Sequence, residues 1–418
     1  MRSWRSTAAT TARRTLAVLA AALPLAVAAC DDSGTGADTQ RDVTIGGIFS
    51  LTGNWATLGV TSKAALELAV ADVNQYATGR GIHFVARTED TKLDPATALA
   101  KVQALHDAGV QVVIGPQSSA ELAAIKSYVD ANDLLVVSQS STAGSLAVAN
   151  DAIFRFTPSD SLEGAAISAL MWADGIRAVV PMWRADAGNQ GLHTATAAKM
   201  TSLGATVSTG VEYSATATDY TASIAALKTQ VHQALAGHSA GQVGVYLAGF
   251  DEVADVFALA AADPELSSVR WYGSDGVALS AAVLAKPAAV AFAEKVGYPN
   301  PVFGLDPAAQ ERWKPVYDRI QTQAGQAPDA FALGVYDAVW VAALTYLASP
   351  AHVNAADLKT RFVATSASYY GVTGWTALNA AGDRKYADFD FWGIRASGAT
   401  HAWTRVASYD TRLGVLTR

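Results

Sequence analysis

The stretch that decides the fold is VVIGPQSSAELAAIKSYVDANDLLVVSQSSTAG, residues 112–144. Two apolar runs, residues 110–114 and 134–137, each precede a cluster of small hydroxyl residues, and the residues between them have a helical pattern. Such a helix returns the chain to the same edge of a sheet, so the two runs are predicted to be neighbouring parallel strands. The two hydroxyl clusters should then lie side by side.

The ends of these strands are a candidate binding site. In a parallel sheet, ligands bind at the carboxyl ends of the strands, where helix N-termini present unpaired N–H groups. Each hydroxyl cluster alone could simply cap a helix. Two clusters that converge at one sheet edge favour a site. The residues predicted at this edge are Gly115, Gln117, Ser118, Ser119, Ser140, Ser141 and Thr142.

The composition indicates a folded, exported protein. With 418 residues, 51% hydrophobic and 16% charged, the chain can bury a large core and form two or three domains. Without the first 29 residues, which hold four basic and no acidic residues, the formal net charge is about −11. No basic stripe with interleaved aromatic residues is present, so we expect no nucleic-acid partner.

The N-terminus is typical of a lipoprotein. Four arginines precede an apolar run, residues 16–29, that is too short and too rich in alanine for a membrane span, so residues 1–29 are predicted to be a signal peptide. Val27-Ala28-Ala29-Cys30 resembles a bacterial lipobox, which implies lipidation of Cys30 and anchoring at the outer face of the cytoplasmic membrane. Residues 30–41 read as a flexible tether. Arg13-Arg14 leaves both Sec and twin-arginine export open.

The rest of the chain alternates between strand and helix patterns. The strand patterns are residues 43–49, 82–87, 110–114, 134–137, 153–157, 178–183, 206–213, 243–247 and 269–272. Their spacing predicts βαβ units and two α/β domains of similar plan. Beyond residue 275 the pattern is helical, at 313–323 and 330–347, and then predicts a β-hairpin of residues 386–394 and 402–409. No long linker separates the halves, so we expect the chain to cross between them more than once.

A series of motifs resembles one family in order. They are residues 43–55, Ala71-Asp72-Val73-Asn74, Thr88-Glu89-Asp90-Thr91, Val113-Ile114-Gly115, Thr218-Asp219-Tyr220, Tyr272-Gly273-Ser274-Asp275-Gly276 and residues 331–337. Together they resemble the type I periplasmic binding proteins, most closely the branch that binds leucine, isoleucine, valine and related small molecules for ABC transporters. Each motif is weak alone, but the ordered series covers most of the mature chain.

The resemblance implies the α/β Venus-flytrap fold, in which two Rossmann-like parallel-sheet lobes are joined by a three-segment hinge and enclose the ligand. Lobe 1 would comprise residues 42–156 plus 300–378, and lobe 2 residues 157–299 plus 379–418. The partners implied are a small-molecule ligand, an ABC permease and, through the N-terminal lipid, the membrane.

The resemblance also implies roles for single residues. Ser119 and Thr142 match positions that hold a ligand carboxylate, and Ser118 and Ser140 are adjacent matching positions. Asp275 matches an acidic residue of the other lobe that receives the ligand ammonium, although an Asp in a Ser-Asp-Gly turn is common in itself. A buried zwitterion needs both charges compensated, so one lobe would take each charge. Trp55 and Phe250 match or adjoin wall positions, and core packing is their alternative role.

Three residues depart from the family pattern. Ala187 stands where family members often carry an aromatic residue, and Gln117 and Gln139 add amides where relatives are apolar. The departures imply a pocket that is wider or more polar than one made for branched aliphatic side chains.

Two other functions remain as alternatives. A hydrolase with a serine nucleophile is disfavoured, because the sequence has no Gly-x-Ser-x-Gly, His-Glu-x-x-His or phosphate-loop motif and its seven histidines are scattered. We expect no enzymatic activity, no metal and no cofactor. A sensor that signals to a membrane receptor would normally carry its own membrane span. We therefore expect a solute-binding lipoprotein that delivers a small amino acid or amide-type ligand to an ABC permease.

Overall fold

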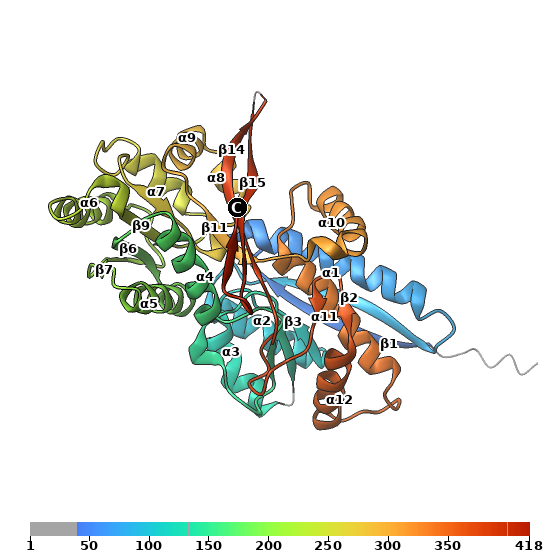
Figure 1. Ribbon diagram of the computed structural model, residues 1–418. Coiled ribbons are helices and arrows are strands. Elements are labelled where there is room, and N and C mark those ends of the chain that lie inside the picture. Colours follow the sequence, from blue (N-terminus) through green and yellow to red (C-terminus); the bar gives the residue numbers. More distant parts are fainter. Residues whose placement is uncertain (1–39, 133, 399) are drawn as a thin grey trace, which may run out of the picture. The chain divides into compact units, whose positions relative to one another are not determined.

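The computed structural model describes residues 40–132, 134–398 and 400–418. Within them, two parallel sheets with flanking helices form an α/β fold, as predicted (Figure 1). The predicted signal peptide, the lipidation site at Cys30 and nearly all of the predicted tether lie outside the described residues.

The first sheet contains the stretch from which the sequence analysis started. Its strand order is β2-β1-β3-β4-β5 and every pairing is parallel. The strands are β1 (Arg41–Phe49), β2 (Ile82–Asp90), β3 (Val112–Ile114), β4 (Leu135–Ser138) and β5 (Ile153–Arg155). The helices that pack with this sheet or on one another beside it are α1 (Ala56–Tyr76), α2 (Pro95–Asp107), α3 (Ser119–Ala131), α10 (Gln310–Ala324), α11 (Ala330–Leu347) and α12 (Ala355–Ser368).

The second sheet has the order β10-β9-β6-β7, and β8 also pairs with β6. Its strands are β6 (Ala178–Ala185), β7 (Thr206–Val207), β8 (Val211–Ser214), β9 (Val243–Ala248) and β10 (Arg270–Tyr272), again all parallel. The helices of this half are α4 (Asp160–Ala173), α5 (Ala187–Ser202), α6 (Thr221–Leu235), α7 (Val253–Ala260), α8 (Ala281–Leu284) and α9 (Pro287–Val296). In Figure 1 these elements run from green to yellow-orange, whereas the first sheet runs from blue to teal.

A third, antiparallel sheet is formed by segments from the last third of the chain. Its order is β11-β14-β15-β16, and the strands are β11 (Asn300–Phe303), β14 (Phe389–Ser397), β15 (Thr400–Asp410) and β16 (Val415–Thr417). The predicted hairpin is therefore confirmed, although it begins at Phe389 rather than at residue 386. A small hairpin, β12 (Tyr370–Gly371) with β13 (Gly374–Trp375), precedes it. β11 pairs with β14, so a segment near residue 300 lies beside the terminal hairpin. The residue boundaries of the lobes stay predictions.

One predicted strand is divided in the structure. Residues 206–213 were expected to be continuous, but β7 and β8 are separated by Ser208, Thr209 and Gly210. Gly210 has φ of +75°, and a Cβ there would come within 2.7 Å of the Pro181 carbonyl oxygen. The chain therefore kinks at a position where only glycine fits, and both pieces still pair with β6.

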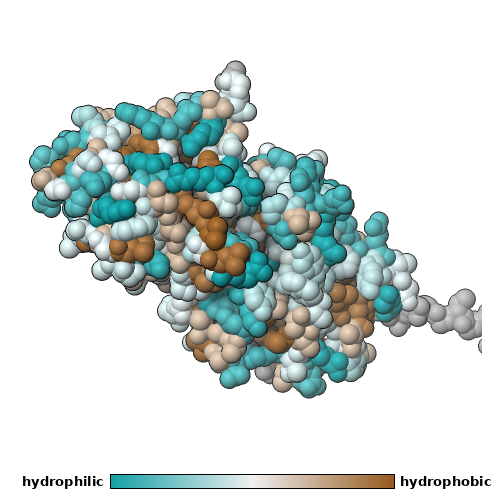
Figure 2. Space-filling view, viewed as in Figure 1, coloured by the Kyte–Doolittle hydropathy of each residue, from teal (hydrophilic) through white to brown (hydrophobic). Residues whose placement is uncertain are grey.

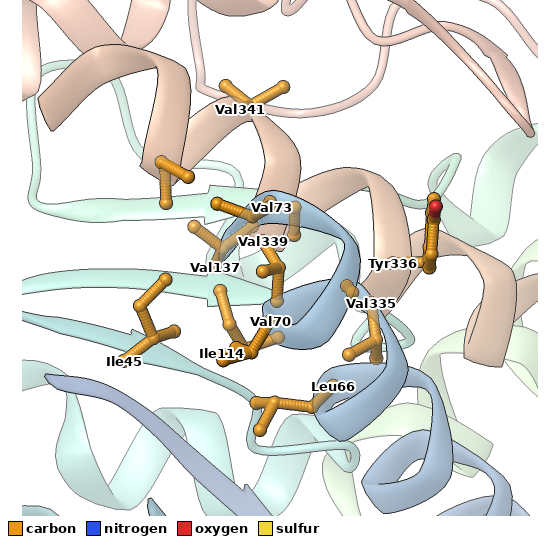
Figure 3. Close-up of a cluster of buried hydrophobic side chains, with 14 of the residues drawn as sticks. Ile45, Leu66, Val70, Val73, Ile114, Val137, Val335, Tyr336, Val339 and Val341 are labelled. Atoms are coloured by element: carbon orange, nitrogen blue, oxygen red, sulfur yellow. The ribbon is translucent and has the colours of Figure 1, made fainter. Parts of the chain in front are cut away.

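The core of the first half lies between α1, α11 and the sheet (Figure 3). Apolar residues of α1 recur at helical spacing and face residues of β1, β3 and α11. Full burial of each such side chain contributes roughly 1.5 to 3 kcal/mol. Those labelled in Figure 3 are Ile45, Leu66, Val70, Val73, Ile114, Val137, Val335, Tyr336, Val339 and Val341.

Helix α11 is apolar because it is enclosed by the rest of the fold. Of the described helices it alone is long and apolar enough to cross a membrane, and 83% of it is buried inside the protein. Burial on nearly all sides is the usual reason for such a composition in a core helix. We therefore assign α11 to the core.

The exposed face in Figure 2 is mostly hydrophilic, with a hydrophobic patch near its centre. Among the exposed large hydrophobic side chains, Trp375, Tyr386, Leu413 and Val415 share one surface groove. These residues belong to β12–β16 and their connections. Exposed apolar side chains thus gather beside the crossover segments.

Candidate ligand-binding site

The two hydroxyl clusters do lie side by side. β3 and β4 are parallel neighbours with Ile114 opposite Val137, so the residues that follow each strand meet at one edge. Gly115 makes the turn after β3 with φ of +101°, where a Cβ would lie 2.1 Å from the Ile48 carbonyl oxygen. Any side chain at this position would displace the strand next to it, so the glycine fixes where the serine cluster begins.

Ser118 is a helix cap as well as a cavity residue. It is the N-cap of α3, and its hydroxyl accepts the N–H of Glu121 at 3.3 Å while donating to the Glu121 carboxyl at 2.6 Å. The carboxyl in turn accepts the Ser118 N–H at 3.1 Å, which completes a capping box. Burial raises the pKa of Glu121 above its usual value. The capping alternative is therefore correct for the Ser118 hydroxyl.

Ser119 is arranged to donate a hydrogen bond into the cavity. Its Oγ accepts the Ser141 hydroxyl at 2.9 Å and the Ala143 N–H at 3.2 Å. Because both of these bonds are accepted, the hydrogen of the Ser119 hydroxyl is left for another acceptor. Ser140 by contrast donates to the Gln117 carbonyl oxygen at 2.9 Å, which leaves its lone pairs.

Seven of the nine predicted ligand-binding residues surround one small cavity. It measures about 10 Å³, room for about one water molecule. The walls come from both halves of the fold and nearly meet, so any larger ligand requires the walls to separate. The lining consists of the predicted Trp55, Ser118, Ser119, Ser140, Thr142, Phe250 and Asp275, together with Gly188, Asn189 and Leu192.

The other two predicted residues, Gln117 and Ser141, are not part of this lining. The Gln117 amide accepts the Ser50 N–H at 3.0 Å and donates to the Trp55 carbonyl oxygen at 2.8 Å. Gln117 therefore fixes the loop that carries Trp55. The Gln139 amide is also turned away, toward the Ser62 hydroxyl at 3.4 Å. Neither Gln117 nor Gln139 lines the cavity, so the expected contribution of their amides to its polarity is not observed.

Direct contacts between the halves close one side of the cavity. The rings of Trp55 and Phe250 stack with centroids 4.3 Å apart and planes 23° apart. Beside them, Asp251 donates its N–H to the Asn54 carbonyl oxygen at 2.6 Å and accepts the Thr57 hydroxyl at 3.0 Å. Burial raises the pKa of Asp251. A ligand that enters from this side must therefore part the aromatic stack.

Three lining residues were not predicted, and all come from the start of α5. Gly188, Asn189 and Leu192 follow β6, and Asp186 caps the helix by accepting the Asn189 N–H at 3.0 Å. A Cβ at Gly188 would lie 3.4 Å from the Ser119 hydroxyl, so the two helix starts approach closely. Asp-Ala-Gly-Asn after a strand is the same signal that identified the serine clusters, and it could have been used here.

Three buried carboxyl groups lie at or near the cavity, and one of them lines it. Asp275 lines the cavity, and its N–H donates to the Glu163 carboxyl at 3.1 Å. Burial raises the pKa of Asp275 to about 8, with a further contribution from the negative charge of Asp160. Burial likewise raises the pKa of Glu163 well above its usual value and that of Asp160 to about 7. All three carboxyl groups are almost inaccessible to solvent.

The nearest arginines already have partners. Arg155 pairs with Asp383 at 2.5 Å and donates to the carbonyl oxygens of Ser141 and Ala143 at 3.3 and 2.6 Å. Arg184 pairs with Asp186 at 2.9 Å and with Glu252 at 3.4 Å. In the part of the chain that the structure describes, no lysine or arginine forms an ion pair with Glu163 or Asp275. This end of the cavity therefore carries acidic groups without a cation.

A larger cavity of about 340 Å³ lies elsewhere and contains none of the predicted binding residues. Its walls are mainly apolar and include Phe303, Trp313 and Tyr317. Within the described ranges, no group of three or more His, Cys, Asp or Glu side chains is placed to hold a metal ion. The small cavity contains seven of the predicted binding residues, and polar groups from both halves line it.

The fold and this cavity define a class of protein. Parallel sheets with crossover strands and a cavity between them are the architecture of type I periplasmic binding proteins, and the predicted resemblance is confirmed. Residues 61–397 match the family described as the receptor family ligand binding region. The chain belongs to this family.

Solved structures with the same fold include solute-binding proteins with different ligands. The substrate-binding protein LivJ from Streptococcus pneumoniae, in complex with isoleucine, aligns with a TM-score of 0.69, 19% identity and coverage of 88% of this chain and 100% of that chain. A solute-binding protein of an ABC transporter from R. palustris, in complex with benzoate, aligns with a TM-score of 0.70, 17% identity and coverage of 87% and 96%. An uncharacterized protein of Methanocaldococcus jannaschii is 29% identical over 396 residues, 90% of this chain and 91% of that protein.

Proposed function

We propose that this protein is an extracytoplasmic solute-binding lipoprotein that captures a small amino acid or amide-type ligand between its lobes and delivers it to an ABC permease. The observation that carries the proposal is the small cavity, which has hydroxyl groups and helix starts on one side and Asp275 on the other. Solute-binding proteins are not enzymes, and the similarity to them supports binding without catalysis.

The ligand carboxylate would bind at the hydroxyl side. Ser119 has a hydrogen to donate, Thr142 lies beside it in the lining, and α3 and α5 both begin at the cavity. N–H groups and the dipole at a helix start favour an anion. Ser118 and Ser140 would add hydroxyl contacts, while Ser141 and Gln117 would act by holding Ser119 and Trp55 in place.

The ligand ammonium would bind at Asp275. This is the carboxyl group that lines the cavity on the second half, and a buried cation needs such a partner. Trp55 and Phe250 would close over the remainder of the ligand. Contacts to both lobes favour the closed state over the open one, and this difference in contacts is what lets a ligand shift the equilibrium.

Export and anchoring rest on the sequence alone. The lipidation of Cys30 and the tether that follows it concern residues outside the described ranges. Replacing Cys30 by alanine should release the protein from the membrane fraction. Retention of the C30A protein in that fraction would contradict anchoring through this residue.

The proposal can be tested with a thermal-shift screen of amino acids, small amides and organic acids, with isoleucine and benzoate included because similar proteins bind them. A bound ligand raises the melting temperature by linkage. The Asp275→Ala variant should lose the shift with an amine ligand, whereas the surface variant Glu294→Gln should keep it. A full shift with Asp275→Ala would rule out the amine assignment, and chemical turnover of a hit would rule out a binding-only function.

A further inference from the structure

Glu163 lies directly behind Asp275, 112 positions away in the sequence. It belongs to the first turn of α4, is 2% exposed, and accepts the Asp275 N–H at 3.1 Å. The two carboxyl groups are also within hydrogen-bonding reach of each other. Glu163 is absent from the cavity lining, so it contacts Asp275 rather than the cavity itself.

Among the described residues, the groups that face this pair offer no compensating positive charge. Asp160 comes from the same helix, Asp329 lies just before α11, and the Tyr246 hydroxyl comes from β9. Tyr246 is fully buried and its hydroxyl has no hydrogen-bond partner of normal geometry. Arg155 lowers the pKa of Asp160 but not below about 7. Burial in this surrounding raises the pKa of Asp275 to about 8 and that of Glu163 well above its usual value, which favours the protonated forms of the pair.

When an amine enters the cavity, charge balance limits how many of these carboxyl groups can ionise. A single ammonium in a buried site is compensated by one carboxylate, and a second ionised carboxyl would be left without a cation. Only Asp275 lines the cavity, so Asp275 is the group that should ionise. Glu163 can stabilise that charge if it stays protonated, since a carboxylic acid has one O–H to donate.

We infer that Glu163 is a positioning residue that remains protonated, accepting the Asp275 N–H with one oxygen and donating its O–H to the Asp275 carboxylate, so that capture of an ammonium-bearing ligand releases one proton. This inference rests on the proposed function. The proton balance is one neutral Asp275 plus one ammonium ion giving a carboxylate–ammonium pair plus one proton in solvent. The ligand class that follows is a small molecule with a single primary ammonium group.

Substitutions of Glu163 can distinguish a protonated side chain from an ionised one. In Glu163→Gln, the amide oxygen can accept the Asp275 N–H and the amide N–H can donate to the Asp275 carboxylate. The glutamine thus reproduces a protonated glutamate and cannot reproduce an ionised one. Glu163→Ala removes both hydrogen bonds. Glu294→Gln, a surface change on α9, is the matched control.

The experiment is isothermal titration calorimetry with L-isoleucine and L-alanine, and with 3-methylpentanoate and propionate, which lack the amine. Titrations at pH 7 in buffers of different ionisation enthalpy give the number of protons released. We expect about one proton for the amino acids, and an affinity that rises up to about tenfold per pH unit between pH 6 and 8. The rise should level off above the pKa of Asp275.

The expected pattern is that Glu163→Gln binds within about threefold of the wild type with the same proton release, while Glu163→Ala binds at least about tenfold more weakly. The inference is overturned if Glu163→Gln is as weak as Glu163→Ala, if the wild type releases no proton, or if the acids without an amine bind equally well. In these cases solute binding itself still stands. If only compounds without an ammonium group bind, the inference fails and the proposed function stands. If no amino acid, small amide or organic acid binds the wild type, both fail.

Discussion

The two walls of the cavity differ in how their buried polar groups are stabilised. The hydroxyl wall, formed by Ser118, Ser119, Ser140 and Thr142, comes from one continuous stretch, and several of its hydroxyl groups already have hydrogen-bond partners. The carboxyl wall is presented to the cavity by Asp275, with Glu163 behind it, and it comes from two distant segments. Asp160 lies beside the hydroxyl wall, where its N–H donates to the Thr142 carbonyl oxygen at 3.0 Å. The first wall is neutral and internally bonded, whereas the second must keep its protons to remain buried.

The two walls make different contributions to the free energy of unfolding. Neutral hydroxyl groups that bond one another can be buried at little cost. Buried carboxyl groups without a cation are costly unless they are protonated, and they gain a partner only when a cation binds. A wall of this kind lowers the stability of the empty protein, and under the proposed function an ammonium-bearing ligand would supply the missing cation. The two walls should therefore respond differently to substitution and to pH.

The largest loss of stability is expected on replacing Arg155, whose charged side chain holds the backbone of the hydroxyl wall in place. Arg155 is 1% exposed and bonds Asp383 and the carbonyl oxygens that follow Ser140. Arg155→Met would leave Asp383 buried without a partner, and the free energy of unfolding should fall by about 3 to 5 kcal/mol. Urea unfolding measures this change.

The double variant Arg155→Met with Asp383→Asn is the control, because it removes the unpaired charge. It should recover part of the loss. A single variant as stable as the wild type would mean that the hydroxyl wall does not depend on this ion pair.

The hydroxyl wall could be predicted because the residues that form it lie close together in the sequence. Two apolar runs, each followed by serines, specify two adjacent strand ends, and the parallel register of β3 and β4 then brings the clusters together. α11 could be predicted residue for residue, since its apolar pattern is long and begins after Asp329, its N-cap. The division of the strand at Gly210 depends on the neighbouring Pro181 and could not be read from periodicity.

The carboxyl wall was predictable only in part. Asp275 was found by its motif, but Glu163 looks like an ordinary acidic residue in the first turn of a helix, where it complements the dipole. Its contact with Asp275 exists only in the folded chain. The same reason applies to Gln117, whose amide is used by the loop of Trp55 rather than by the cavity. Which side of a strand-end cluster faces the cavity is decided by tertiary packing.

The next effect is a pH dependence of stability that arises from Asp160, the buried carboxyl group beside Thr142. The raised pKa of Asp160, about 7, means that the folded protein holds this proton when the unfolded chain has lost it, between about pH 4 and pH 7. The stability contributed by this proton is present at low pH and is lost as the pH rises through that window. The change is about 1.4 kcal/mol per pH unit.

Asp160→Asn removes this titration. From pH 5 to pH 7 the wild type should lose about 2 to 3 kcal/mol more of its free energy of unfolding than the variant does. Urea unfolding at the two pH values, without ligand, provides the measurement. Equal losses for the two proteins would show that burial does not hold Asp160 in its protonated form.

The smallest loss of stability is expected on removing a single hydroxyl group of the hydroxyl wall. Ser119→Ala removes the acceptor of the Ser141 hydroxyl and of the Ala143 N–H, and leaving these buried donors unpaired should cost about 1 to 2 kcal/mol of stability. Ser141→Ala, which removes only one donor, should cost less. Binding of L-isoleucine should weaken in Ser119→Ala, but the dependence of that affinity on pH should match the wild type, because the lost group does not titrate. A changed pH slope in Ser119→Ala would mean that the two walls are coupled, and that the neutral wall helps to set the protonation of the acidic one.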